Sequence, residues 1–333
     1  MTEIILVLSF ILSFLLTIYG TPITRKVAHR YKILDYPNGK LKKQKEPIPY
    51  MGGVIVYFSF IAPVGLLIPF NKELLGILFA GSILLIVGLF DDLKALTPHI
   101  KFLFQIIATF ILIKSGIFIN LIFLPSWLNT ILSFIWILSI INAVNIIDIL
   151  DGLASSICTI ASLTIFTISL FNNNFLITIL SISLAGSLLA FLKFNWKPAK
   201  IYLGDAGAML VGMILGSLTI MIDYTIFNDA GFLLAILILA IPVFDIIYVI
   251  IIRILKGLSP FMGSPDHFSL RFKKKLSLTA SKTVSYIVLI QLVITVLIII
   301  NFFLNTIFTI ISTFCIILFF SIYGLWLSGE KME

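Results

Sequence analysis

Carboxylate side chains stand at the ends of long apolar segments in this sequence. Asp91 and Asp92 close one segment, and Asp205 lies at the start of another. If these segments cross a membrane, each buried charge costs about 3 kcal/mol on insertion scales, and neighbouring carboxylates repel one another. A divalent cation offsets both costs, and Mg²⁺ is usually held by one or two carboxylates together with substrate phosphates. These aspartates therefore predict a Mg²⁺ site, with Mn²⁺ as the alternative ion, and chemistry on phosphates.

A second set of polar side chains recurs at every third position. On a helix, side chains at this spacing drift slowly around one face, so they can point into one cavity. The set consists of Asn142, Asn145, Asp148 and Asp151. Asn195 follows farther along the chain, and a last polar cluster contains Asp266, His267 and Arg271.

Basic residues complete the candidate set. Lys101 follows the Asp91–Asp92 pair, and Lys45 closes a basic stretch that begins at Lys40. Lysines beside a metal site can bind phosphate oxygens through charge-assisted hydrogen bonds. The stretch ending at Lys45 is equally typical of a simple anchor at a membrane surface, and the sequence leaves both interpretations open. Asp245, inside an apolar segment, is expected to form an ion pair or polar contact within the protein.

The elements that must position these residues are membrane helices. Of the 333 residues, 60% are hydrophobic and 11% are charged, whereas about 25% are charged in soluble domains. This composition excludes a soluble domain, a disordered chain and a nucleic-acid-binding protein. The apolar runs are continuous and lack the alternation of barrel strands. We expect an all-α integral membrane protein of about eleven spans, with ten as the alternative, at residues 3–19, 51–70, 74–90, 102–119, 127–144, 153–171, 175–192, 204–222, 232–255, 283–302 and 306–327.

The basic residues orient this bundle. With eleven spans, every Lys and Arg except Lys72 and Lys114 falls on the same side of the membrane. Cytoplasmic loops carry the excess of basic residues, so we expect the N-terminus outside and the C-terminus in the cytoplasm. All the polar clusters described above then lie at the cytoplasmic face. The net charge of +8 thus reflects orientation and phosphate chemistry.

In their order along the chain, these motifs resemble the polyprenyl-phosphate N-acetylhexosamine-1-phosphate transferases, or glycosyltransferase family 4, which include the phospho-MurNAc-pentapeptide translocase. Asp91-Asp92 with Lys101 is similar to the family's Asp-Asp…Lys motif, and Gly204-Asp205 to its metal-binding motif. The run from Asn142 to Leu153 is similar to the pattern Asn-x-x-Asn-x-x-Asp-Gly-x-Asp-Gly-Leu. The resemblance spans residues 35–272 of a single polytopic domain, residues 1–333, in which 273–333 form the last two helices.

The resemblance implies a role for each candidate residue. It implies catalytic or acceptor-orienting roles for Asp91, Asp92 and Asp148, and a metal-binding role for Asp205, assisted by Asn145. The residues that it implies for substrate binding are Lys45, Lys101, Asn142, Asp151, Asn195, His267 and Arg271.

The resemblance also implies a reaction and a location. A UDP-N-acetylhexosamine, with UDP-GlcNAc as the expected donor, would transfer its sugar 1-phosphate to undecaprenyl phosphate and release UMP. This step begins the synthesis of a lipid-linked cell-envelope glycan, such as lipopolysaccharide or teichoic acid. The enzyme would be a multi-pass protein of the bacterial inner membrane with a cytoplasmic active site. The partners are the donor, the lipid acceptor and the bilayer, while the oligomeric state stays open, a homodimer included.

Two departures from the family pattern bear on specificity. Ile149 stands where the family has glycine, and the last loop keeps His267 and Arg271 but lacks two further histidines. The missing histidines favour the GlcNAc branch over the branch that uses UDP-MurNAc-pentapeptide. The alternative donors are UDP-MurNAc-pentapeptide and other UDP-N-acetylhexosamines. Alternatives of a different class are a transporter or flippase, which would carry ionisable groups near the midplane, and a scaffold with an inactive site.

Overall fold

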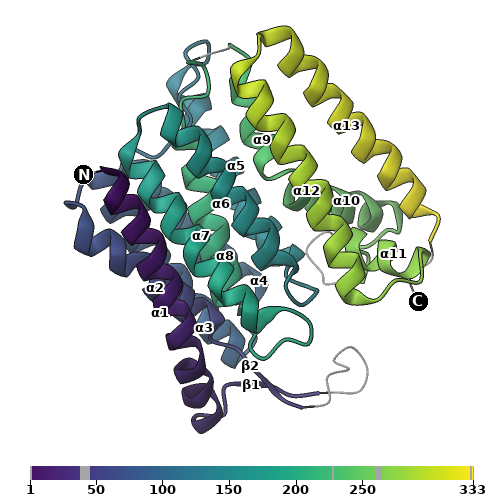
Figure 1. Ribbon diagram of the computed structural model, residues 1–333. Coiled ribbons are helices and arrows are strands. Elements are labelled where there is room, and N and C mark those ends of the chain that lie inside the picture. Colours follow the sequence, from purple (N-terminus) through teal and green to yellow (C-terminus); the bar gives the residue numbers. More distant parts are fainter. Residues whose placement is uncertain (1, 38–45, 227–228, 260–264, 331, 333) are drawn as a thin grey trace.

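The computed structural model is almost entirely helical and describes residues 2–37, 46–226, 229–259, 265–330 and 332. Each of the eleven predicted segments coincides with one helix or with one bent pair of helices. The elements are α1 (Thr2–Arg30), β1 (Leu34–Asp35), β2 (Ile48–Pro49), α2 (Gly52–Leu67), α3 (Lys72–Leu93), α4 (Pro98–Lys114), α5 (Ser126–Ile147), α6 (Leu153–Phe171), α7 (Phe175–Asn195), α8 (Gly204–Met221), η1 (Gly231–Leu233), α9 (Leu234–Ile238), α10 (Ala240–Leu255), α11 (Phe268–Lys275), α12 (Ala280–Phe303) and α13 (Thr306–Ser328). Figure 1 shows the long helices side by side, with α10–α13 grouped at one side of the bundle.

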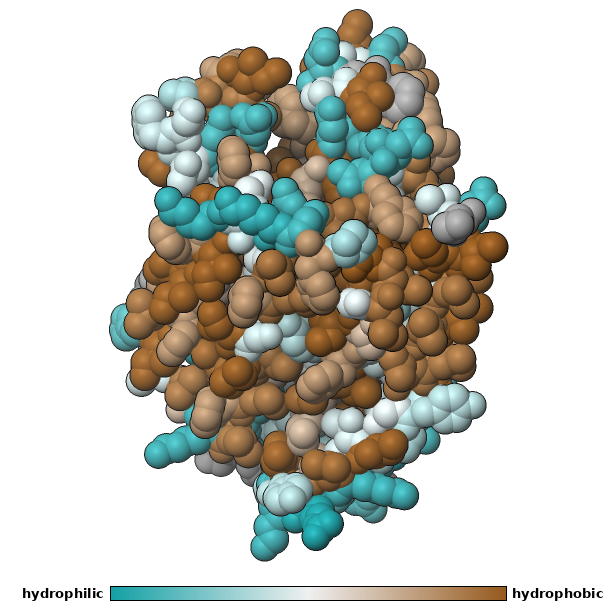
Figure 2. Space-filling model, turned by 90° about the vertical axis from the view of Figure 1, so that its left-hand side faces the viewer, coloured by the Kyte–Doolittle hydropathy of each residue, from teal (hydrophilic) through white to brown (hydrophobic). Residues whose placement is uncertain are grey.

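The long helices are those of a polytopic membrane protein. Within the described residues, eight helices are long and apolar enough to cross a membrane, or nine if the bent pair is one span. The helices α2 and α4, with 16 and 17 residues, are shorter than the roughly 20 residues that a span requires. Eleven spans and the orientation of the termini therefore stay predictions. Figure 2 shows a broad hydrophobic band between hydrophilic residues above and below, as expected for a surface in contact with lipid.

The ninth segment, predicted as one continuous span over 232–255, is broken. Helices α9 and α10 meet at Leu239 with a bend of 71°. Pro242 lies in the first turn of α10. The N–H groups of that turn have no acceptor within the helix, so the N–H that proline lacks costs no hydrogen bond. The break turns α10 toward the short helix α11.

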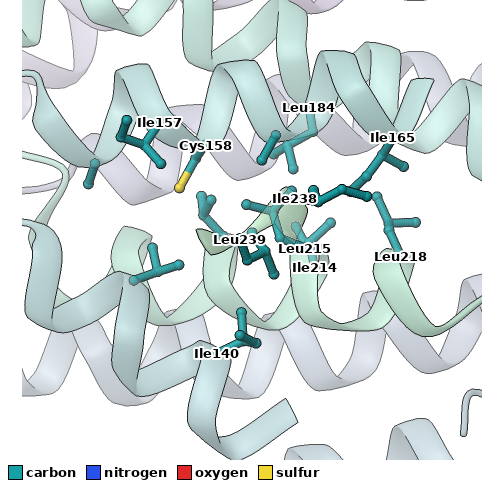
Figure 3. Close-up of a cluster of buried hydrophobic side chains, with 14 of the residues drawn as sticks. Ile140, Ile157, Cys158, Ile165, Leu184, Ile214, Leu215, Leu218, Ile238 and Leu239 are labelled. Atoms are coloured by element: carbon teal, nitrogen blue, oxygen red, sulfur yellow. The ribbon is translucent and has the colours of Figure 1, made fainter. Parts of the chain in front are cut away.

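Helix α8 lies at the centre of the bundle. It packs against α2, α3 and α5, and all but one of its side chains between Gly204 and Thr219 are buried. Figure 3 shows α8 side chains such as Leu215 facing Ile140 of α5, Cys158 of α6 and Leu184 of α7 in one apolar cluster. The packed core therefore fixes the position of the N-terminus of α8, where Asp205 stands.

Glycines allow α8 to approach its neighbours closely. A Cβ on Gly53 of α2 would lie 2.3 Å from the backbone nitrogen of Gly207, and one on Gly88 of α3 would lie 2.2 Å from Cα of Ala206. Small residues at helix interfaces in membranes permit backbone contact of this kind. The ends of α2, α3 and α8 thus converge around Asp205.

Candidate active site

A cavity of about 540 Å³ opens where these helix ends meet. Its volume lies in the range of small-molecule binding sites. Six carboxylates from four parts of the chain contribute to its wall, together with amide and phenol side chains. The lining residues are Asp35, Tyr50, Asp91, Asp92, Ala95, Asn145, Asp148, Ile149, Leu150, Asp151, Asn195, Tyr202, Gly204 and Asp205.

Asp92 holds the first turn of α8. Its two carboxylate oxygens accept hydrogen bonds from the backbone N–H groups of Asp205 (2.9 Å) and Ala206 (3.4 Å). The first N–H groups of a helix have no internal acceptor, and a carboxylate there also complements the helix dipole. Gly204 makes this contact sterically feasible, because its φ is +74° and a Cβ would lie 2.5 Å from Oδ2 of Asp92. Asp92 thus presents Asp205 to the cavity.

Lys101 connects two of the aspartates. Its Nζ lies 2.9 Å from Oδ2 of Asp91 and 2.9 Å from Oδ2 of Asp205. Asn145 donates from Nδ2 to Oδ1 of Asp205 (3.1 Å), and the backbone of Leu96 donates to Oδ1 of Asp91 (2.7 Å). The side chains of α3, α4, α5 and α8 therefore meet at the carboxylate of Asp205.

Asp148 and Asp151 reach the cavity from a turn. The sequence placed both on a helical face with Asn142 and Asn145, but α5 ends at Ile147 and α6 begins after Gly152, whose φ is +79°. Among the described residues, no hydrogen-bond donor contacts the carboxylate of Asp148. Burial, and next the charges of Asp205 and Asp151, raise the pKa of Asp148 to about 7. Asp148 can therefore exchange a proton near neutral pH.

The substitution at position 149 is compatible with this turn. Ile149 replaces the family's glycine, but it is not among the residues with positive φ, so its backbone does not need glycine. Its side chain is 39% exposed at the cavity wall.

Two of the predicted substrate-binding amides serve the scaffold. Asn195 is buried, accepts from the backbone of Gly152 (3.1 Å) and from Oγ of Ser155 (2.9 Å), and donates to the carbonyl of Ile201 (3.1 Å). Asn142 does not line the cavity. Its amide donates instead to Oε1 of Gln105 (2.8 Å).

Asp151 also has internal partners. Its Oδ2 accepts from the backbone N–H of Ala199 (3.0 Å) and lies 3.1 Å from Nζ of Lys197. It still lines the cavity, so it both ties down the loop after α7 and adds negative charge to the wall.

Three wall residues with polar side chains were not predicted as site residues. Strands β1 and β2 pair antiparallel, which sets Asp35 opposite Ile48, and Tyr202 donates from its N–H to the carbonyl of Pro49 (2.8 Å). Asp35, Tyr50 and Tyr202 thereby join the wall, the two rings 6.1 Å apart. Burial and the neighbouring Asp35 raise the pKa of Tyr50, so its phenol stays protonated. Asp35 is the first residue of the stretch that resembles the family, residues 35–272, whereas the two tyrosines carry no signal in the sequence.

The donor set fits a hard divalent cation. No group of three or more His, Cys, Asp or Glu side chains in the described part of the chain forms a complete metal cage. Mg²⁺ does not require one, because it keeps several waters and binds through one or two carboxylates plus substrate phosphates. Asp205 and Asp91 both contact the ammonium group of Lys101, so their carboxylates already face one positive charge. Asn145 adds an amide group beside Asp205.

The remaining predicted residues lie elsewhere. Neither His267 nor Arg271 lines the cavity, and both have partners of their own: Nδ1 of His267 lies 3.1 Å from Oδ2 of Asp245, and Nη2 of Arg271 lies 2.6 Å from Oδ1 of Asp266. The ion pair or polar contact expected for Asp245 is thus made with His267. Lys45 falls outside the described residues.

Comparison with known proteins agrees with the motifs. Residues 74–223 match the sequence model of glycosyl transferase family 4. The chain is similar to a protein of Bacillus subtilis named as a probable undecaprenyl-phosphate N-acetylglucosaminyl 1-phosphate transferase, with 28% identity over 75% of this chain and 72% of that protein. The resemblance inferred from the motifs is therefore confirmed.

Two further relatives differ in donor or acceptor. A decaprenyl-phosphate N-acetylglucosaminephosphotransferase of Mycobacterium leprae is 28% identical over 78% of this chain and 74% of its own length. A phospho-N-acetylmuramoyl-pentapeptide-transferase of Streptococcus sanguinis is 27% identical over 65% of this chain and 74% of its own length. All three are named as transferases of phosphorylated amino sugars, and the chain is accordingly a phosphotransferase.

Proposed function

Because residues 74–223 of this phosphotransferase match the sequence model of glycosyl transferase family 4, we propose that it transfers N-acetylglucosamine 1-phosphate from UDP-GlcNAc to undecaprenyl phosphate. The products are the diphosphate-linked lipid and UMP. The names of the relatives from Bacillus subtilis and Mycobacterium leprae support the transfer of a GlcNAc phosphate to a polyprenyl phosphate.

The arrangement around Asp205 carries the proposal. Six aspartates line the cavity, while Lys101 and Lys197 are the lysines paired with them in the described structure. A pyrophosphate would be repelled from such a wall unless a cation came with it. The cavity therefore suits a substrate that arrives with Mg²⁺, such as a nucleotide sugar. Asp205, Asp91 and Asn145 would hold the ion, and its charge would offset that of the phosphates.

The chain's own groups can position the reacting phosphates. We propose that an oxygen of the lipid phosphate attacks the β-phosphorus of the donor directly, and that the bond from this phosphorus to the UMP oxygen breaks. Catalysis of phosphoryl transfer rests mostly on positioning and charge stabilisation. Lys101 offers an ammonium next to Asp205, and Asp148 can take a proton from the acceptor phosphate.

The site must serve a soluble and a lipid substrate together. The cavity lies at the ends of apolar helices, where a phosphate anchored in the bilayer can meet a nucleotide from the aqueous phase. We propose that this end faces the cytoplasm of a bacterium. The distribution of basic residues, with eleven spans, supports that orientation.

One observation supports UDP-MurNAc-pentapeptide as a second candidate donor. The relative from Streptococcus sanguinis is named for transfer of phospho-N-acetylmuramoyl-pentapeptide. Purified protein in detergent should therefore be assayed with undecaprenyl phosphate, Mg²⁺ and separate UDP-sugars, including UDP-GlcNAc, UDP-GalNAc and UDP-MurNAc-pentapeptide. We expect release of UMP with UDP-GlcNAc. Turnover only with UDP-MurNAc-pentapeptide would replace the proposed donor, and no turnover with any donor would reject the proposed reaction.

A further inference from the structure

The loop motif around Arg271 meets the C-terminal end of the last helix. Arg271 is 2% exposed, although it belongs to the basic helix α11. Its Nη1 donates to the carbonyl oxygens of Leu327 (3.4 Å), Ser328 (3.3 Å) and Glu330 (2.6 Å). The last carbonyls of a helix lack internal donors and carry the negative end of its dipole, so a guanidinium satisfies both.

Further contacts join the same two segments. Lys275 donates to the carbonyl of Trp326, and its Nζ lies 4.5 Å from the centroid of the Trp326 indole. Lys274 lies 3.8 Å from a carboxylate oxygen of Glu330. Figure 1 shows the C-terminal end of α13 beside α11. We call this set of contacts, between α11 and residues 326–330, the C-terminal clamp.

The other side of the loop is fastened to α10. Oδ1 of Asp266 accepts from Nη2 of Arg271 and from Nζ of Lys256 at the end of α10, both at 2.6 Å. Burial alone would raise the pKa of Asp266, but these two hydrogen bonds lower it, so the carboxylate stays charged. Asp245, fully buried in α10, accepts from the backbone N–H of Phe268 (2.9 Å) and pairs with His267. Helix α11 is thus held between α10 and α13.

We propose that Arg271 is a positioning residue that acts through the end of α13, and that it is not a ligand of the substrate phosphates. Its Nη1 and Nη2 groups are used by α13 and Asp266, inside a buried site apart from the cavity wall. By fixing α11, the clamp fixes the His267–Asp245 pair at the start of that helix. The effect on turnover rests on the proposed function, whereas the effect on α11 does not.

Two changes test the clamp. The first is Arg271→Gln, and the second replaces residues 327–333 by a flexible Gly-Ser tail, which keeps the new terminal carboxylate away from Arg271. Lys273→Gln, a charge removal on the same helix, is the matched control. Hydrogen exchange of the amides of 268–275 is measured in detergent, together with kcat and KM for donor and acceptor.

We expect each change to raise exchange in 268–275 by tenfold or more and to lower kcat, with both KM values within about twofold of wild type. The variant that combines both changes should show no faster exchange and no lower kcat than either single variant, because the effects of two changes to one set of contacts are not additive. Arg271→Lys should retain part of the protection, since lysine keeps the charge but cannot reach Asp266 and the carbonyls together. The control should leave exchange and kinetics unchanged.

A tenfold rise in KM for donor or acceptor in Arg271→Gln, with normal exchange, would overturn the proposal and make Arg271 a phosphate ligand. Strictly additive effects of the two changes would overturn it as well. If wild type shows no turnover while the exchange results hold, the proposed reaction fails and the clamp stands.

Discussion

The carboxylate of Asp92 accepts the backbone N–H of Asp205 at 2.9 Å, across 113 positions of sequence. The sequence motif suggested that Asp91 and Asp92 act together on the acceptor phosphate. In the structure the pair is divided. Asp91 turns to Lys101, whereas both oxygens of Asp92 hold the first turn of α8. We therefore expect Asp92 to act on the reaction through the position of Asp205.

Gly204 should be required for this contact. Gly204→Ala forces an alanine into a left-handed conformation, which costs about 1–2 kcal/mol, and sets its Cβ 2.5 Å from Oδ2 of Asp92. Gly257→Ala is the matched control, because its φ is +69° but nothing lies within 4 Å. We expect at least a 100-fold loss of turnover at position 204, about the effect of misplacing a key group, and near-normal turnover at 257. Equal losses in UMP release would contradict the steric account.

Removal of the Lys101 charge should strengthen Mg²⁺ binding but lower turnover. Lys101→Gln removes a positive charge that lies 2.9 Å from both Asp91 and Asp205, so Mg²⁺ should bind more tightly to the wall. Turnover should fall about 100-fold, because an oriented cationic donor is lost. Lys197→Gln, which removes a half-exposed partner of Asp151, should change either quantity less than threefold. Titration calorimetry with Mg²⁺ checks the first effect, and weaker binding in Lys101→Gln would disprove it.

Asp148 should make stability depend on pH. Its folded-state pKa of about 7 lies above the ordinary value of 3.8, so folding favours the protonated form. This contribution is complete below about pH 4 and is lost as the pH rises through about 7. Without Mg²⁺, the apparent Tm of the wild type should therefore fall between pH 5 and pH 8. Asp148→Asn should reduce that slope, while Asp223→Asn, at an exposed position, should leave it unchanged.

Asn195 should behave as a structural residue, although the motif suggested substrate binding. Asn195→Ala leaves the buried N–H of Gly152 and the carbonyl of Ile201 without partners, at about 1–3 kcal/mol each. We expect a Tm several degrees lower, and a donor KM within twofold of wild type at temperatures where the variant is folded. Asn120→Ala, at an exposed loop position, is the control. A normal Tm with a raised KM would restore the substrate-binding role.

The sequence predicted the charged part of the site well, because each aspartate stands beside an apolar run and in a family motif. Asp91, Asp148, Asp151 and Asp205 line one cavity as expected. The roles of the other residues depend on contacts between distant segments, such as β2 with Tyr202, which spacing along the chain does not reveal. The same holds for Arg271, whose partners at 327–330 become visible only when α11 and α13 are brought together.

The fold was predictable to the level of its apolar segments. Hydropathy located the helices, but it could not show that Pro242 and Leu239 mark a 71° bend or that α5 ends before Asp148. The bend comes from local backbone geometry within an apolar segment, and the end of α5 comes from the turn that carries Asp148, Asp151 and Gly152.

The most direct test of the central claim follows the β-phosphate of the donor. UDP-GlcNAc labelled at its β-phosphorus is incubated with undecaprenyl phosphate, Mg²⁺ and the purified protein, and the lipid is extracted. We predict that the label enters the lipid fraction in equal amount to the UMP released, and that Asp205→Asn abolishes both. Label that stays in the aqueous phase as UDP while the sugar alone enters the lipid would contradict the account.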